Sequence, residues 1–220
     1  MMSNQPTAAQ VAQPVRTDAY LDTLQMFTGV ALILFMWSHM ILVASVNFGP
    51  GVMNAIAGFL ERTYLAQTGG PVIAFVFLVH FVLAARKLPF RAKEQKAMWE
   101  HSVRFNHLDT WLWNVQAITA MIILIMGSIH MWTVLTNLPI TAAKSAARVQ
   151  TGWWLLFYLL LLPMIELHVG IGFYRIGVKW GWITRSNRKG LKRFENKLTL
   201  VFITIGLITL FTLYFIINPA

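Results

Sequence analysis

Five long apolar stretches alternate with short polar connections along the 220-residue chain. They cover about residues 22–46, 71–86, 111–136, 152–177 and 198–217. An α-helix rises 1.5 Å per residue, so about 20 apolar residues cross the roughly 30 Å of bilayer hydrocarbon. In lipid, a helix satisfies its own backbone polar groups, so runs of this length predict helices. The pattern predicts an all-α integral membrane protein, a bundle of five transmembrane helices. The second run is short, and its helix is expected to begin earlier, near residues 63–68.

Composition agrees with a membrane protein. Hydrophobic residues make up 57% of the chain and charged residues 12%, about half the usual share of charge in a soluble domain. The chain has no cysteine, which excludes disulfides, iron–sulfur clusters and c-type haem attachment within it. Residues 1–19 are polar and lack the apolar core of a signal peptide, so we expect a cytoplasmic leader before a single membrane domain, 20–220.

Basic residues are concentrated in two of the four connections. The connection between the second and third runs and the one between the fourth and fifth hold most of the Lys and Arg side chains. Basic loops remain on the cytoplasmic side, so the N-terminus is predicted inside and the C-terminus outside. The net charge of +10 is explained by these loops, and no nucleic-acid partner is expected.

Four of the six histidines lie inside the apolar runs, each in a different run: His39, His80, His130 and His168. Helical rise puts His39 roughly 25 Å and His130 roughly 28 Å from the inner ends of their helices. By the same rise, His80 and His168 lie only roughly 9–10 Å from theirs. The four therefore form an outer pair and an inner pair. His101 and His107 lie in an inner connection and are expected at the surface.

Two histidine pairs at two depths fit two b-type haems, each iron held by two imidazoles. The irons would lie roughly 17 Å apart along the membrane normal, and neither would keep an open position for oxygen. The pattern therefore favours electron transfer. Small residues near the histidines, such as Gly127 and Gly170, suit either a flat macrocycle or close helix packing. A single four-histidine zinc site is disfavoured by the two depths.

Several segments around these histidines resemble a known family. They are FMWSHM, FLVHFVLAARKLPF, HLDTWLWNVQA, GSIHMW and ELHVGIGFYRIGVKWGW, within a match over about residues 22–215. They are similar to the dihaem cytochrome b membrane anchor of quinol:fumarate reductase, in the succinate dehydrogenase/fumarate reductase superfamily. The resemblance implies two haems b, menaquinone, and a flavoprotein subunit and an iron–sulfur subunit on the cytoplasmic face of the bacterial inner membrane. It also implies a dimer of the whole complex.

The resemblance implies roles for two carboxylates. Glu166, in the ELH segment, would move protons during electron transfer. Glu61, between the first and second runs, would accept a proton from menaquinol; from spacing alone, a solvated loop carboxylate paired with Arg62 is the simpler interpretation. Haem propionates need donors near the membrane surfaces. We expect Lys179, Gln25 and Trp113 to bind propionates of the inner haem and Arg148 to bind those of the outer haem.

Two other functions remain open from the residues. A dihaem cytochrome b of a hydrogenase or formate dehydrogenase would also carry paired histidines. A haem-free channel or transporter would line a proton path with the histidines and Glu166, and would be colourless.

Overall fold

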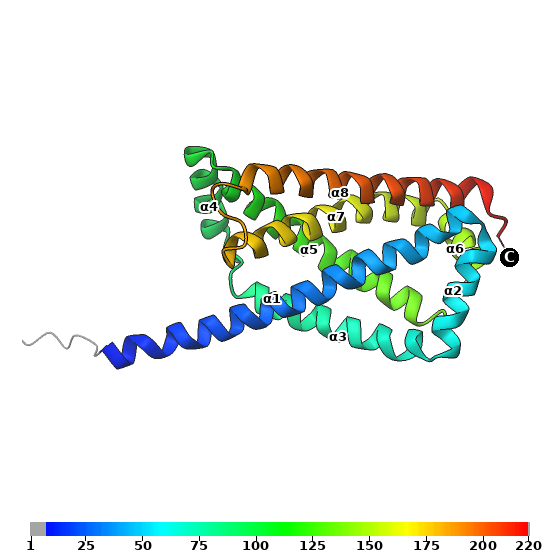
Figure 1. The fold of residues 1–220 in the computed structure, drawn as a ribbon, viewed down its shortest axis with the longest axis horizontal. Coiled ribbons are helices and arrows are strands. Elements are labelled where there is room, and N and C mark those ends of the chain that lie inside the picture. The colour runs from blue at the N-terminus through cyan, green and yellow to red at the C-terminus, as the bar shows by residue number, and fades with distance from the viewer. Residues whose placement is uncertain (1–7, 220) are drawn as a thin grey trace, which may run out of the picture.

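The computed structural model describes residues 8–219, with side chains from residue 16 onward, and all regular elements in this part are helical (Figure 1). Five segments are long and apolar enough to span a bilayer. They are built on α1 (Ala8–Ala44), α3 (Leu65–Ala85), α5 (Leu108–Leu135), α7 (Trp153–Lys179) and α8 (Arg188–Phe211). The predicted all-α membrane protein with five spanning helices is confirmed.

Short helices occupy the connections, which the hydropathy pattern did not predict. They are the 3-10 turn Ser45–Phe48, α2 (Pro50–Arg62), α4 (Ala92–Phe105) and α6 (Ala142–Val149), and a π-helical turn Thr212–Ile216 extends α8. Each of them buries part of its surface: α2 buries Met53 and Ala57, α4 buries Ser102, and α6 buries Ala142, Ala146 and Val149. Such helices are too short and too polar to be recognised by an apolar run.

The helix ends differ from the apolar runs because a helix can continue beyond the hydrocarbon. The second spanning helix begins at Leu65, as its short run suggested, and α8 begins ten residues before 198. The helix α1 begins at Ala8, so the expected leader 1–19 is continuous with it from there on; residues 1–7 lie outside the described residues. Ala, Gln, Lys and Arg favour helix, which explains both extensions.

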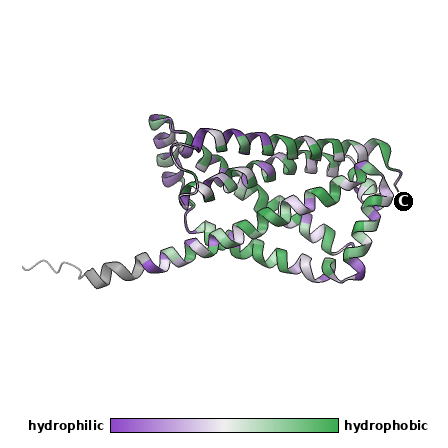
Figure 2. Ribbon diagram, in the orientation of Figure 1, coloured by the Kyte–Doolittle hydropathy of each residue, from purple (hydrophilic) through white to green (hydrophobic). Residues whose placement is uncertain are grey.

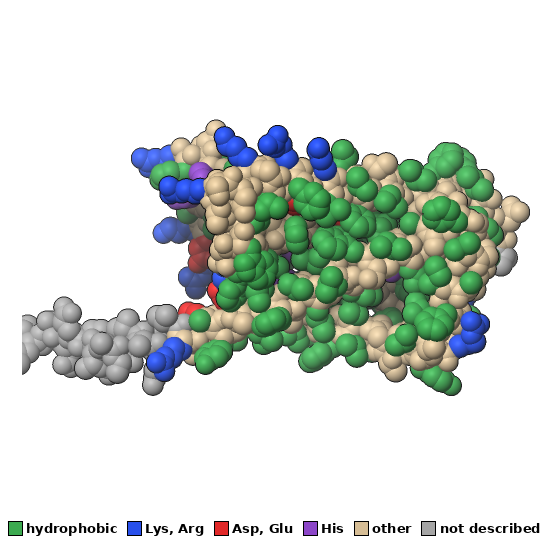
Figure 3. Space-filling view, viewed as in Figure 1, with side chains coloured by type: hydrophobic (Ala, Val, Ile, Leu, Met, Phe, Trp, Pro, Cys, Tyr) green, Lys and Arg blue, Asp and Glu red, His purple; other side chains and the backbone are tan. Residues whose placement is uncertain are grey.

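The spanning helices form a bundle whose two ends differ in polarity. Helix α7 packs against α5 and α8, while α1 crosses the bundle and packs against α3. Helix α4 and the α7–α8 connection, residues 180–187, lie at one end, here called the basic end (Figure 1). Helices α2 and α6 and the C-terminus lie at the opposite, far end. Hydropathy falls sharply at the basic end (Figure 2), where Lys and Arg side chains gather (Figure 3).

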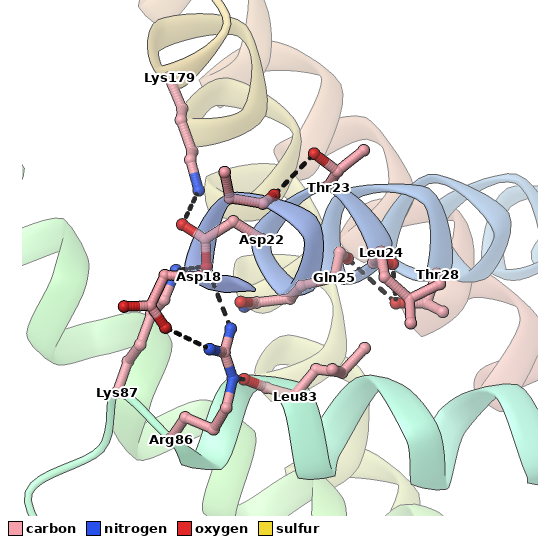
Figure 4. Close-up of polar contacts among 11 residues, drawn as sticks. Asp18, Asp22, Thr23, Leu24, Gln25, Thr28, Leu83, Arg86, Lys87 and Lys179 are labelled. Atoms are coloured by element: carbon pink, nitrogen blue, oxygen red, sulfur yellow. Dashed lines mark hydrogen bonds and ion pairs between the residues drawn. The ribbon is translucent and has the colours of Figure 1, made fainter. Parts of the chain in front are cut away.

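Polar contacts tie the helices together at each end. At the basic end the Asp22 carboxylate lies 2.5 Å from the ammonium groups of both Lys87 and Lys179 and 3.1 Å from Arg86, which joins α1 to α7 and to the end of α3 (Figure 4). At the far end the side chain of Asn54 accepts a hydrogen bond from the backbone of Ala142, joining α2 to α6. Both sets of contacts lie at the ends of the bundle, outside its apolar middle. Burying polar and charged groups costs less free energy there than in the hydrocarbon region.

Helices α7 and α8 pack closely at Gly170. A Cβ atom on Gly170 would lie 2.2 Å from Thr199 Oγ1 and 2.7 Å from Glu195 Oε1, and both partners are buried. The small residue at Gly170 therefore serves helix packing. Of the two uses suggested by the sequence, the haem-approach interpretation is wrong for this glycine.

Gly170→Ala is expected to lower the free energy of unfolding by about 1–3 kcal/mol, because the new methyl group overpacks the α7–α8 contact. The midpoint of thermal unfolding, followed by circular dichroism of the detergent-solubilised protein, measures the effect. Gly190→Ala is the matched control, since Gly190 lies on α8 with open space around its Cβ position. Equal midpoints for Gly170→Ala and the unsubstituted protein would contradict the assignment.

Candidate functional site

A cavity of about 810 Å³ runs through the bundle between α1, α3, α5 and α7. Its wall contains nine of the ten residues singled out from the sequence: Gln25, His39, His80, Trp113, His130, Arg148, Glu166, His168 and Lys179. Glu61 is the tenth and is absent from the wall. Ligand pockets have volumes of about 300–1,000 Å³ and combine apolar walls with a few polar groups. This cavity is therefore the candidate site.

One histidine pair lies toward the far end of the cavity. His39 and His130 each precede the last residue of their helix, Ala44 or Leu135, by five residues. Their ring centroids are 5.9 Å apart, with an interplanar angle of 61°. Two metal–nitrogen bonds of about 2 Å to one ion bring imidazole centres to a similar separation, about 6 Å. The structure therefore brings together the two histidines that helix depth paired.

Each ring of this far-end pair has an aromatic neighbour. The His39 ring stacks on Phe35, with centroids 5.6 Å apart and planes 16° apart. His130 Nδ1 lies 3.3 Å from the hydroxyl of Tyr158 on α7. Tyr158 also interacts with Arg148, whose guanidinium lies 6.0 Å from the Trp154 ring centroid. The far-end pair is thus connected to a cation at the cavity rim.

The second pair lies toward the basic end, with His80 on α3 and His168 on α7 close enough to interact electrostatically. His80 Nδ1 lies 3.0 Å from Thr28 Oγ1, and the ring also contacts the backbone carbonyl of Gln25 on α1. A Cβ atom on Gly29 would lie 3.1 Å from the His80 ring, so glycine allows this ring to approach α1 closely. These contacts occupy Nδ1 and leave Nε2 for another partner.

His168 has an equivalent set of contacts on α5. Its Nδ1 lies 3.1 Å from Thr119 Oγ1 and 3.2 Å from the carbonyl oxygen of Gln116. A histidine that binds a metal through one nitrogen usually donates the other N–H to a carbonyl, carboxylate or water. Both basic-end histidines therefore have the surroundings that a metal ligand requires.

The residues fit two separate two-ligand sites better than one zinc site. Within residues 8–219, no group of three or more His, Cys, Asp and Glu side chains is arranged to hold one ion. The cavity wall also contains small residues that leave room for a flat macrocycle, namely Gly29, Ala84, Gly127 and Gly172. Buried oxygens of Gln25 and Gln116, both on the wall, lack a hydrogen-bond partner within the protein. A polar ligand or water in the cavity would pair such groups.

Cations lie at both mouths of the cavity. At the basic end, Lys87 and Lys179 line the wall beside Asp22, so Lys179 is an ion-pair partner as well as a rim residue (Figure 4). At the far end, Arg148 lines the wall, and Lys144 donates to the backbone carbonyls of Asn137 and Pro139. The distribution suits a ligand that is apolar in its middle and acidic at both ends of the cavity.

The two candidate carboxylates have different surroundings. Glu166 is 2% exposed, lies on the cavity wall, and its Oε1 has no hydrogen-bond partner within the protein. Glu61 lies one residue before the end of α2 and is half-buried, and its Oε1 accepts a hydrogen bond from Gln67 at 3.2 Å. The structure therefore brings Glu166 to the histidines and leaves Glu61 beside the far end.

Sequence reasoning missed the groups that hold the histidine rings. Thr28, Thr119 and Tyr158 are uncharged, and hydropathy does not distinguish them from other residues of their helices. A usable signal was present, however. The same four-residue pattern, Gln-x-x-Thr, occurs at 25–28 and again at 116–119, once on each of two spanning helices.

Comparisons with known proteins show the family of the chain. Residues 92–213 match the model of the succinate dehydrogenase/fumarate reductase transmembrane subunit family. The chain is 34% identical over 201 residues to the fumarate reductase cytochrome b subunits of two strains of Helicobacter pylori, covering 87% of this chain and 78% of theirs. It is 34% identical over 207 residues to the subunit of the same name from Wolinella succinogenes, covering 88% and 81%. The chain therefore belongs to the succinate dehydrogenase/fumarate reductase transmembrane subunit family.

Proposed function

We propose that this chain is the dihaem cytochrome b subunit of a fumarate reductase or succinate dehydrogenase complex. It transfers electrons between menaquinol or menaquinone in the membrane and the other subunits of the complex. The observation that carries this proposal is the presence of two histidine pairs on the wall of one cavity. The relatives, which are named as fumarate reductase cytochrome b subunits, support the assignment.

The four histidines hold two haems b in this proposal. His80 and His168 ligate the haem at the basic end, and His39 and His130 ligate the haem at the far end. Each haem, when bound, supplies a one-electron redox centre with no open position for oxygen. Lys179, Gln25 and Trp113 bind propionates at the basic end, and Arg148 does so at the far end, because these side chains line the corresponding mouths.

Quinol oxidation also releases protons, and two carboxylates serve this step in the proposal. Glu61 accepts a proton from menaquinol at the far end, where it lies outside the cavity wall but beside Leu60, which lines it. Glu166 carries a proton through the bundle, a role supported by its burial and its unpaired oxygen. A carboxylate acts as general base only within hydrogen-bond reach of its partner, so Glu61 requires quinone bound at the far end.

The basic end faces the cytoplasm in this proposal and binds the iron–sulfur and flavoprotein subunits. The positive-inside rule and the gathering of Lys and Arg there support this orientation (Figure 3). The N-terminus is then inside and the C-terminus outside the bacterial inner membrane, with residues 20–220 forming one membrane domain. The whole complex is proposed to form a dimer.

A reduced-minus-oxidised optical spectrum of the purified complex, with pyridine haemochrome quantitation, tests the proposal. We expect two low-spin b haems per chain and co-purification of a flavoprotein. A co-purifying molybdenum or nickel subunit would instead indicate a formate dehydrogenase or hydrogenase. A folded, colourless protein would contradict the cytochrome assignment and favour a haem-free proton path.

A further inference from the structure

The Gln-x-x-Thr pattern occurs on two helices, and each copy contacts a histidine of a neighbouring helix. On α1 it presents Thr28 to His80, and on α5 it presents Thr119 to His168. In both cases the glutamine contributes its backbone carbonyl to the same histidine ring. Helical periodicity explains the spacing, because residues three apart lie on one face of a helix.

The hydroxyl hydrogens of both threonines are directed to their own helices. Thr28 Oγ1 lies 3.0 Å from the carbonyl oxygens of Leu24 and Gln25. Thr119 Oγ1 lies 2.7 Å from that of Val115 and 3.1 Å from that of Gln116. A hydroxyl has one hydrogen, which these carbonyls accept, so the histidine contact uses an oxygen lone pair.

The histidine nitrogen must then be the donor. The Thr Oγ1 lone pair accepts at both rings, and the Gln116 carbonyl is a second acceptor at His168, so Nδ1 of His80 and of His168 carries the hydrogen. In a neutral imidazole the other nitrogen, Nε2, then has the free lone pair. The network thereby selects one tautomer for both rings and reserves Nε2 for a ligand in the cavity.

The far-end pair lacks this arrangement among the described contacts. His130 Nδ1 meets the Tyr158 hydroxyl, which can donate or accept, and the His39 ring stacks on Phe35. Two acceptors on an N–H increase electron density on the imidazole and make it a stronger donor to a metal. The two ends of the cavity therefore differ in the electronic character of their histidines.

We propose that Thr28 and Thr119 are positioning residues that set the tautomer and the donor strength of His80 and His168. They thereby lower the reduction potential of the basic-end haem and leave that of the far-end haem unchanged. This inference rests on the proposed function, since it requires a haem at the basic end. The threonines act through the histidines and do not touch the iron.

Thr28→Val and Thr119→Val in the purified complex test the inference, because valine keeps the shape and removes the hydroxyl. Redox titration followed by optical absorption gives both haem potentials. We expect two retained haems and an increase in one potential, equivalent to about a tenfold change in the ferric–ferrous equilibrium, or about 59 mV. The serine variants restore the hydroxyl and should restore the potential.

Thr133→Val is the matched control, because the Thr133 hydroxyl donates to the Ile129 carbonyl of its own helix, α5. Unchanged potentials in both valine variants, or equal shifts of both haems, would overturn the inference. If the valine variants lose one haem and the serine variants keep it, the result supports the inference. Loss from valine and serine variants alike would indicate packing alone and overturn it. A haem-free unsubstituted complex would instead overturn the proposed function.

Discussion

His80→Ala is expected to lower the haem content from two to one per chain, and His168→Ala to remove the same haem. Each substitution deletes one of the two imidazoles proposed to hold one iron, so that haem is expected to be lost. His39→Ala and His130→Ala should each remove the other haem. Pyridine haemochrome quantitation measures the content, and redox titration identifies which haem remains.

Double substitutions make this prediction specific to the pairing. The His80→Ala/His168→Ala variant should retain one haem, whereas His80→Ala/His130→Ala should retain none. His101→Ala is the control, since His101 is exposed on α4 and should leave both haems bound. One haem remaining in the His80→Ala/His130→Ala variant, at a normal potential, would show that the pairs are assigned wrongly.

Glu166→Gln is expected to reduce quinol oxidation by about 10²–10⁴-fold while both haems remain bound. The amide is similar in size to the carboxylate but cannot take up and release a proton at neutral pH. The assay is menaquinol oxidation by fumarate in the complete complex. Fumarate reduction with a soluble electron donor bypasses the membrane subunit and should be unchanged.

Glu100→Gln provides the matched control for this carboxylate. Glu100 is exposed on α4, lies 3.8 Å from Lys96 and is not part of the cavity wall. It should leave quinol oxidation unaffected. If Glu166→Gln also retained full quinol oxidation, Glu166 would be a buried structural residue, and its unpaired oxygen would need another explanation. Glu61→Gln distinguishes the role of Glu61 from that of Glu166, because only Glu61 is proposed to accept a proton directly from quinol.

The number and type of the spanning helices were predictable, because lipid demands long apolar helices and the sequence carries the required runs. The helices in the connections, such as α4 and α6, were not predicted. Their stability comes from one face packing on the bundle. Ser102 on α4, for example, is fully buried and accepts a hydrogen bond from Asn114 on α5. A hydropathy pattern does not predict a hydrogen bond between two helices.

Helix depth placed the four histidines at two levels, because rise per residue is nearly constant and the sequence shows where each apolar run ends. The structure brings His39 and His130 to a centroid distance of 5.9 Å. Depth alone did not reveal which helix faces meet. Gly170 packs against Thr199 and does not face a macrocycle. That outcome depends on the rotation of α7 about its axis, which no sequence pattern shows.

Hydropathy and helical rise act along one chain, so they were enough to predict the membrane fold, the five spanning helices and the two levels of intramembrane histidines. Which groups surround each histidine ring became visible only in the folded protein. Thr28 and His80 are 52 residues apart and Thr119 and His168 are 49 apart, yet each pair lies within 3.1 Å. Such contacts depend on the rotation and crossing of whole helices, which packing sets only once all of them are assembled.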